Sequence, residues 1–105
     1  MDHKIKYYYN NKDKKSSEEY WHNGRYHRDD GPAFISWHYV NSSIKSIVYM
    51  INGGYHRDDG PAYQYFDEDG TLIKEEYWLD DIAYTKFDWL IKTRIKKLKK
   101  LYEKR

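Results

Sequence analysis

The chain has 105 residues and a net charge of +2, from 19 Lys and Arg against 17 Asp and Glu. This length favours one domain, and so balanced a charge does not by itself indicate nucleic-acid binding. The absence of cysteine excludes a disulfide scaffold, a thiol nucleophile and a zinc finger with Cys ligands. No apolar run approaches the roughly 18 residues of a membrane-spanning helix. Because the charged N-terminus is followed by no apolar stretch, we expect an intracellular protein that is not secreted.

Aromatic side chains supply most of the material for a core. The chain has 13 Tyr, 4 Trp and 3 Phe, whereas disordered segments are poor in aromatic residues. Each buried ring removes about 150–250 Å² of surface from water, so aromatic packing can replace aliphatic packing. We therefore predict an ordered but thin protein.

One octapeptide occurs twice. Residues 26–33 and 55–62 both have the sequence YHRDDGPA, 29 residues apart, and an Asn-Gly pair precedes each copy. The tetrapeptide EEYW also occurs twice, at residues 18–21 and 75–78. Self-similarity at a fixed period indicates a repeat architecture. The chain thus contains about two and a half units, beginning with a half-unit.

The units predict antiparallel strands. Gly-Pro turns and polar loops separate segments that are rich in aromatic and β-branched residues. In chain order, the predicted strands are residues 5–9, 17–22, 33–40, 44–51, 62–66 and 71–79. The Asn-Gly pairs indicate type I′ hairpin turns, because both residues tolerate a positive φ. The predicted fold is mainly β, an antiparallel meander of six strands in stacked β-hairpin repeats over residues 5–85.

A helix is predicted over residues 86–103, where the hydrophobic period changes from 2 to 3.6. Thr85 and Asp88 resemble a capping box. Seven apolar side chains, which we call the apolar stripe, lie within about 140° of the helical wheel: Phe87, Leu90, Ile91, Ile95, Leu98, Leu101 and Tyr102. We expect this amphipathic helix to cap the open end of the sheet through the stripe, so that residues 1–105 form a single domain. The alternative is an oligomer seam through the stripe, in a homodimer.

The helix also concentrates positive charge. Residues 88–105 carry a net charge of +6, and residues 1–87 carry −4. Such asymmetry is typical of a surface that binds nucleic acid or an anionic membrane. The candidate residues for this electrostatic binding are Lys92, Lys96, Lys97, Lys99 and Lys100. The competing interpretation is a solvated face on a helix that docks on an acidic sheet.

The repeated motif is predicted to be structural. Its residues are His27, Arg28, Asp29, Asp30, Gly31 and Pro32, and then His56, Arg57, Asp58, Asp59, Gly60 and Pro61. The His and Asp side chains could offer ligands to a metal ion, but equivalent residues two strands apart would lie about 10 Å from each other. We expect instead that the aspartates shape the turn and that the arginines pair with acids of the neighbouring unit. No metal site and no cofactor are predicted.

Protein–protein contact is the predicted activity, without catalysis. Adjacent acids such as Glu18 and Glu19 point to opposite faces of a strand, so they do not form a catalytic pair. A single-layer sheet with one helix leaves a face uncovered, and buried aromatic residues usually dominate the binding energy of an interface. The candidate anchors for a protein partner are Trp21, Trp37, Tyr39, Tyr65 and Trp78.

The order of these motifs resembles the MORN repeat: Tyr-Trp, Asn-Gly, Tyr-His, a turn with glycine and an aromatic strand. The recurring HRDDGPA is similar to the units of repeat proteins found in giant viruses and phages, and the resemblance covers residues 5–85. The chain has Arg-Asp-Asp-Gly-Pro where ordinary MORN units have His-Gly-x-Gly. The resemblance implies a sheet of stacked hairpins that acts as a scaffold or binds a partner. For a viral protein, the expected location is the host cytoplasm.

Overall fold

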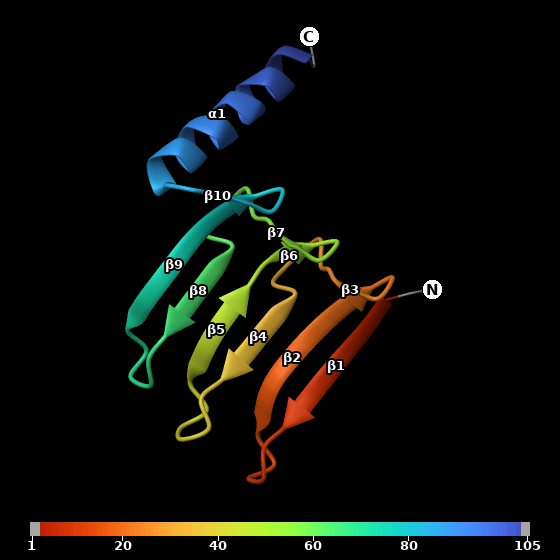
Figure 1. Cartoon of the computed structure of the whole chain (residues 1–105), viewed down its shortest axis with the longest axis vertical. Coiled ribbons are helices and arrows are strands. Elements are labelled where there is room, and N and C mark those ends of the chain that lie inside the picture. Colours follow the sequence, from red (N-terminus) through yellow and green to blue (C-terminus); the bar gives the residue numbers. More distant parts are fainter. Residues whose placement is uncertain (1–2, 104–105) are drawn as a thin grey trace.

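The computed structural model describes residues 3–103, which form ten strands and one helix. Figure 1 shows the longer strands side by side in one sheet, with the helix beyond the β9 and β10 end of the molecule. In chain order the elements are β1 (His3–Tyr9), β2 (Lys15–His22), β3 (Arg25–Tyr26), β4 (Phe34–Trp37), β5 (Ile44–Val48), β6 (Met50–Ile51), β7 (Gly54–Tyr55), β8 (Tyr63–Phe66), β9 (Leu72–Leu79), β10 (Ile82–Tyr84) and α1 (Lys86–Glu103).

The six longer strands form the predicted meander. Their order is β1-β2-β4-β5-β8-β9, every neighbouring pair is antiparallel, and β10 joins at the β9 edge. The short strand β3 pairs with β2, and β6 pairs with β7 in a separate ribbon. The sequence did not predict β3, β7 and β10 as strands, because two or three residues carry no alternating pattern. The predicted strand 44–51 is interrupted at Tyr49, so β6 pairs with β7 instead of continuing β5. The mainly β, antiparallel architecture with a C-terminal helix is confirmed.

Three tight hairpins join the strands at one end of the sheet. Asn23-Gly24 and Asn52-Gly53 have φ between 48° and 82°, as expected for type I′ turns. The third hairpin, between β9 and β10, has the pair Asp80-Asp81 with φ of 49° and 64°. Aspartate is one of the few residues other than glycine that adopt this conformation readily. The third unit therefore keeps the turn although its sequence departs from Asn-Gly.

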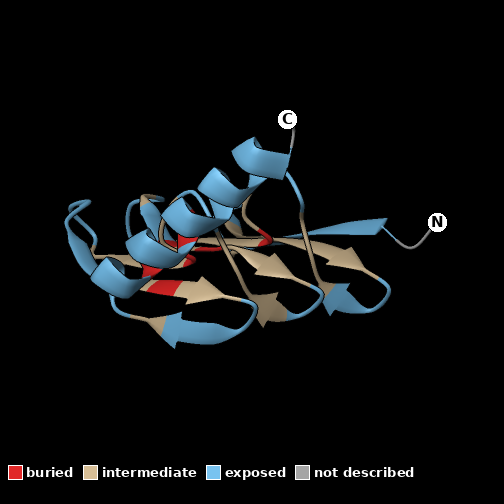
Figure 2. Cartoon of the chain, turned by 90° about the horizontal axis from the view of Figure 1, so that it is seen from above, coloured by how far each residue is buried: buried red, intermediate tan, exposed pale blue. Residues whose placement is uncertain are grey.

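The core is thin. The molecule measures 55 × 37 × 21 Å along its principal axes. Figure 2 shows few buried residues, and these lie where the helix and the crossing loops meet the sheet. The buried apolar residues are Ala33, Val48, Ala62, Tyr77 and Trp89. Ala33 and Ala62 end the two octapeptides, and each bonds to strands on both sides through its backbone N–H and C=O. The order of this sheet therefore depends on backbone pairing and partly buried rings more than on a deep interior.

Helix α1 begins as predicted but docks by a different face. Thr85 caps it, since its Oγ1 accepts a hydrogen bond from the Asp88 N–H at 3.1 Å. The Trp89 ring lies 4.9 Å from that of Tyr77, and its Nε1–H donates to the Arg57 carbonyl at 2.9 Å. The buried helix residues are Trp89 and Thr93, whereas the members of the apolar stripe are 42–72% exposed. The prediction that the stripe docks on the sheet is therefore wrong.

Candidate interaction surfaces

Each repeated motif folds into a loop held by its arginine. The Arg28 guanidinium stacks on Tyr20 at 4.0 Å from the ring centre, and its Nε–H donates to Asp30 at 3.1 Å. Arg57 repeats both contacts, with Tyr49 at 3.8 Å and Asp59 at 2.8 Å. The expected pairing of the arginines with acids of the neighbouring unit is thus wrong. The tight turn brings the aspartate of the same loop within reach instead.

Glycine leaves room for the guanidinium inside each loop. A Cβ atom on Gly31 would lie 2.9 Å from Cζ of Arg28, and one on Gly60 would lie 2.8 Å from Cζ of Arg57. The guanidinium crosses the glycine closely because it also bonds to the proline carbonyl after it, at 3.3 Å for Arg28 and 3.1 Å for Arg57. The recurrence of Arg-Asp-Asp-Gly-Pro is therefore explained by local packing.

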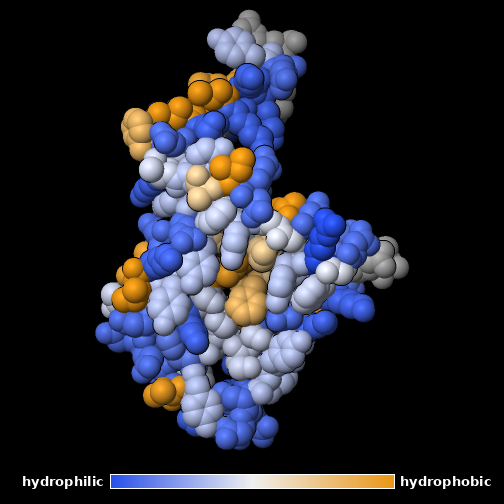
Figure 3. All heavy atoms as spheres, viewed as in Figure 1, coloured by the Kyte–Doolittle hydropathy of each residue, from blue (hydrophilic) through white to orange (hydrophobic). Residues whose placement is uncertain are grey.

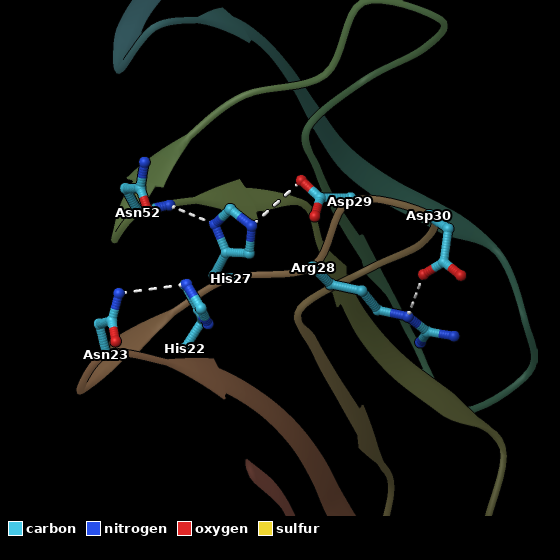
Figure 4. A network of polar contacts seen from close by, with 7 residues as sticks. All are labelled: His22, Asn23, His27, Arg28, Asp29, Asp30 and Asn52. Carbon is cyan, nitrogen blue, oxygen red and sulfur yellow. Dashed lines mark hydrogen bonds and ion pairs between the residues drawn. The ribbon is translucent and has the colours of Figure 1, made fainter. Parts of the chain in front are cut away.

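Histidine joins one repeat to the next. Nδ1 of His27 accepts a hydrogen bond from the backbone N–H of Asn52 at 2.9 Å, and Nδ1 of His56 accepts one from Asp80 at 2.9 Å. Figure 4 shows His27 between Asn52 and Asp29, and its Nε2 lies 3.1 Å from the Asp29 carboxylate. This link was not predicted from the sequence, although the recurrence of the histidine was a signal for it.

A cation lies near a tyrosine ring again at the start of α1. At the 28-residue spacing of Tyr49 and Tyr77, the residue that matches Arg57 is Thr85. The next residue, Lys86, has its Nζ 6.0 Å from the centre of the Tyr77 ring. It thus takes the place of the arginine over the equivalent tyrosine, at a longer distance. Helix α1 therefore begins within a degenerate third copy of the repeat, and Trp89 packs on the last tyrosine of the series.

The predicted anchors do not form a single cluster. Trp21 packs on Tyr26 at 4.3 Å, and Trp78 packs on Tyr55 at 4.8 Å. Each indole N–H donates to a glutamate two residues earlier on the same strand, at 3.0 Å. These half-buried rings therefore stabilise the hairpins of the chain itself. Tyr39 lies in the β4–β5 loop, where its hydroxyl donates to Asn11 at 2.6 Å.

Three of the five anchors nevertheless share one face of the sheet. The strand registers place Phe34 and Tyr63 on the same face as these three anchors. We call this surface the aromatic face: Trp21, Phe34, Tyr63, Tyr65 and Trp78. Tyr77 points to the opposite face, because it alternates with Trp78 along β9, and α1 packs on Tyr77. The aromatic face is therefore not the face that the helix covers. Trp37, half-buried, follows a shift in the β4–β5 register.

Three of the five candidate lysines line one cavity. A hollow of about 410 Å³ lies between α1 and the end of β9, lined by Lys92, Lys96, Lys99, His56, Asp80 and Tyr84 among others. Lys97 and Lys100 are outside this set. Nζ of Lys92 lies 5.3 Å from the centre of the Tyr84 ring. Part of the predicted positive surface thus lies beside the carboxylate of Asp80. The negative charge of this carboxylate offsets some of the positive charge of the lysines.

The shifted pKa values belong to structural contacts. The hydrogen bond from Lys15, at 2.7 Å, holds the pKa of Glu18 below its ordinary value. Burial raises the pKa of Tyr20 and of Tyr26. These shifts favour the protonation states that the groups already have at neutral pH, so they do not create a general base or a nucleophile. Within residues 3–103, no group of three His, Asp or Glu side chains is arranged to hold a metal ion.

A scan against protein-family models and searches of curated proteins and of solved structures find no match to this chain. The resemblance to MORN repeats therefore stays a prediction from the motifs. In the part of the chain that the structure describes, no helix has the length and apolar character needed to cross a membrane.

Proposed function

We propose that this chain is a non-enzymatic, MORN-like repeat module that acts as a protein–protein interaction or scaffold unit. The observation that carries the proposal is the single layer. Helix α1 packs on the Tyr77 side of the sheet, so it does not cover the half-buried rings of the aromatic face, and the apolar stripe is exposed. Contiguous apolar surface of several hundred Å² is typical of a binding site for another molecule. In keeping with the motif resemblance, we infer a viral origin.

Contacts between repeats make the sheet suitable as a scaffold. Each unit is tied to the next by a histidine side chain and by backbone bonds such as Arg28 N–H to the Met50 carbonyl, at 3.2 Å. Such nearest-neighbour coupling gives repeat proteins an extended surface of fixed shape. We assign Trp21, Tyr65 and Trp78 as the partner-binding residues of the aromatic face, since rigid aromatic side chains lose little entropy on binding.

Site-specific crosslinking tests this proposal. A photoreactive phenylalanine analogue in place of Tyr65, on the aromatic face, should give one discrete crosslinked protein in a lysate of the cell that makes the chain. The same analogue at the exposed loop residue Val40, 66% exposed, serves as the matched control and should give none. Crosslinking that is equal at both positions, or absent at Tyr65, would contradict a protein partner on this face.

Binding to nucleic acid or an anionic membrane through α1 is the alternative function. The cavity that Lys92, Lys96 and Lys99 share with His56 favours it, because clustered cations attract phosphate groups. The discriminating variant replaces Lys96, Lys97, Lys99 and Lys100 by Gln. Electrostatic binding should disappear in this variant and fall steeply with salt in the wild type, whereas apolar protein contacts should change little in either experiment.

A further inference from the structure

The apolar stripe of α1 faces away from the sheet, apart from Ile95, which lines the hollow beside β9. At about 100° per residue, Trp89 and Thr93 lie on the opposite side of the helical wheel from the stripe, and they are the buried residues of the helix. Phe87, Leu98 and Leu101 of the stripe are 69%, 50% and 63% exposed. Figure 3 shows apolar atoms gathered along one border of the helix. The face that periodicity marks as hydrophobic is thus left on the surface.

We propose that this stripe binds the same stripe of a second copy of the chain, so that two α1 helices form an antiparallel homodimer. The inference rests on the proposed function, because it names the partner for one of the two apolar surfaces. It concerns α1 alone and makes no use of the aromatic face.

The area of the stripe fits a dimer interface. Its seven side chains are 42–72% exposed, and a large side chain presents roughly 200 Å² when fully exposed. The stripe therefore offers on the order of 800 Å² per copy, which is about what each partner contributes to a stable interface of standard size. A surface of this extent is also larger than a soluble monomer usually leaves open.

Charge along the helix favours the antiparallel orientation. Asp88 lies in the first turn, whereas Lys99 and Lys100 lie near the C-terminal end. On the helical wheel, Asp88 and Lys99 border the same edge of the stripe. A twofold axis near the middle of the stripe brings like edges together, so each Asp88 comes beside Lys99 of the second copy. A parallel pair would instead align all the C-terminal lysines with one another.

A second copy suits the stripe better than an anionic bilayer does. Residues 1–87 carry a net charge of −4, so an anionic surface would repel the body of the protein. Arg94 also lies within the stripe. Between two helices its stem can pack on apolar neighbours while the guanidinium reaches water at the edge. The two Arg94 side chains approach each other near the twofold axis, which weakens the dimer and supplies a specific test.

Sedimentation equilibrium of the full chain, from about 1 to 500 μM in about 150 mM salt, measures the dimer. The wild type should show a monomer–dimer equilibrium. The double variant Ile91→Gln and Leu98→Gln should raise the dissociation constant at least about 100-fold, because four large apolar side chains leave the interface. Arg94→Leu should lower it about threefold or more, since it removes the central repulsion and adds apolar area.

Two controls keep the result interpretable. The variant Lys96→Gln and Lys100→Gln places the same number of glutamines on the opposite side of the helix and should not weaken the dimer. Far-UV circular dichroism should show equal helix content in all variants, because Trp89 and Thr93 are retained. For orientation, Phe87→Cys should not form a disulfide between copies, whereas a mixture of Phe87→Cys and Tyr102→Cys should form one.

A wild type that is monomeric at about 500 μM would overturn the proposal, and so would a dimer that the stripe variant leaves intact. Binding of monomers to vesicles that contain phosphatidylserine, lost in the stripe variant, would overturn it in favour of a lipid partner. The proposed function is tested separately. A monomeric chain that still crosslinks a protein from Tyr65 would contradict only the dimer. A dimer that gives no such crosslink would contradict only the role as a scaffold for other proteins.

Discussion

Nδ1 of His27 lies 2.9 Å from the backbone nitrogen of Asn52 and accepts a hydrogen bond from its N–H. A side chain of one repeat thus pairs with a backbone N–H in the hairpin of the next repeat. His56 repeats the arrangement with Asp80 at the same distance. Because an imidazole that accepts at Nδ1 carries its proton at Nε2 when neutral, the contact also fixes the tautomer. These two histidines supply one of the side-chain links that hold the units in register.

Replacing His56 by Phe should destabilise the fold by about 1 kcal/mol, because the ring is kept but the acceptor for the Asp80 N–H is lost. Urea unfolding, followed by tryptophan fluorescence, measures the change. His27→Phe should cost a similar amount. His56→Asn should recover part of the loss, since its side-chain oxygen can take the place of Nδ1. An unfolding midpoint that is equal in all these variants would show that the link contributes nothing.

Gly60→Ala should cost about 1 kcal/mol of unfolding free energy. A Cβ there lies 2.8 Å from Cζ of Arg57, and the guanidinium must give up its place between Tyr49 and Asp59. The expected loss is small because alanine also reduces the entropy of the unfolded chain. In a background with Arg57→Ala the same substitution should be neutral or stabilising. A penalty that persists without the arginine would refute steric conflict as its cause.

Trp89→Ala should release α1 from the sheet. The substitution removes the ring that packs on Tyr77 and the bond to the Arg57 carbonyl, and an isolated helix of this length is only marginally stable in water. Amide hydrogen exchange should become at least about tenfold faster throughout α1. The control is Phe87→Ala, because Phe87 is 69% exposed. In the monomeric protein it should change the exchange rate of α1 by less than about twofold. The reverse ranking would mean that the helix docks through the stripe.

Acid should weaken the contact between Lys15 and Glu18. The pKa of Glu18 is lowered in the folded state from its ordinary value of 4.5, so the pair stabilises the fold above that value and the contribution is lost as the pH falls through the lowered pKa. Glu18→Gln should therefore be less stable than the wild type at pH 6 and equally stable near pH 2. Urea titrations at both pH values measure the two stabilities. When Lys15→Met is added to both the wild type and Glu18→Gln, the difference in stability between them at pH 6 should shrink.

Much of the sheet could be predicted because local chemistry determines it. Asn-Gly pairs at 23–24 and 52–53 specify type I′ hairpins, and the duplicated octapeptide indicates that both units fold alike. The short strands β3, β7 and β10 escaped prediction because they are too short for an alternating pattern, and so did the break that separates β6 from β5. They form because the preceding turns place them beside a partner strand.

The docking face of α1 could not be predicted from periodicity. The hydrophobic pattern favours the aliphatic stripe, whereas the helix attaches through one tryptophan that lies among lysines on the wheel. The reason is the surface that receives it: Tyr77 offers a ring and the Arg57 backbone offers a carbonyl. Periodicity reports how side chains are distributed around a helix, but not which of them meets a complementary partner. For the same reason, the predicted partners of Arg28 and Arg57 were wrong.

The central claim is that this chain works by apolar protein contact. Light scattering on a size-exclusion column tests it most directly, at about 50 and 500 mM salt and with or without a short random-sequence DNA. We predict the mass of a dimer at both salt concentrations, somewhat more populated at high salt because the basic helices repel each other less, and no complex with DNA. A DNA complex at about 50 mM salt that dissolves at 500 mM would contradict the account and make the lysines of α1 the functional site.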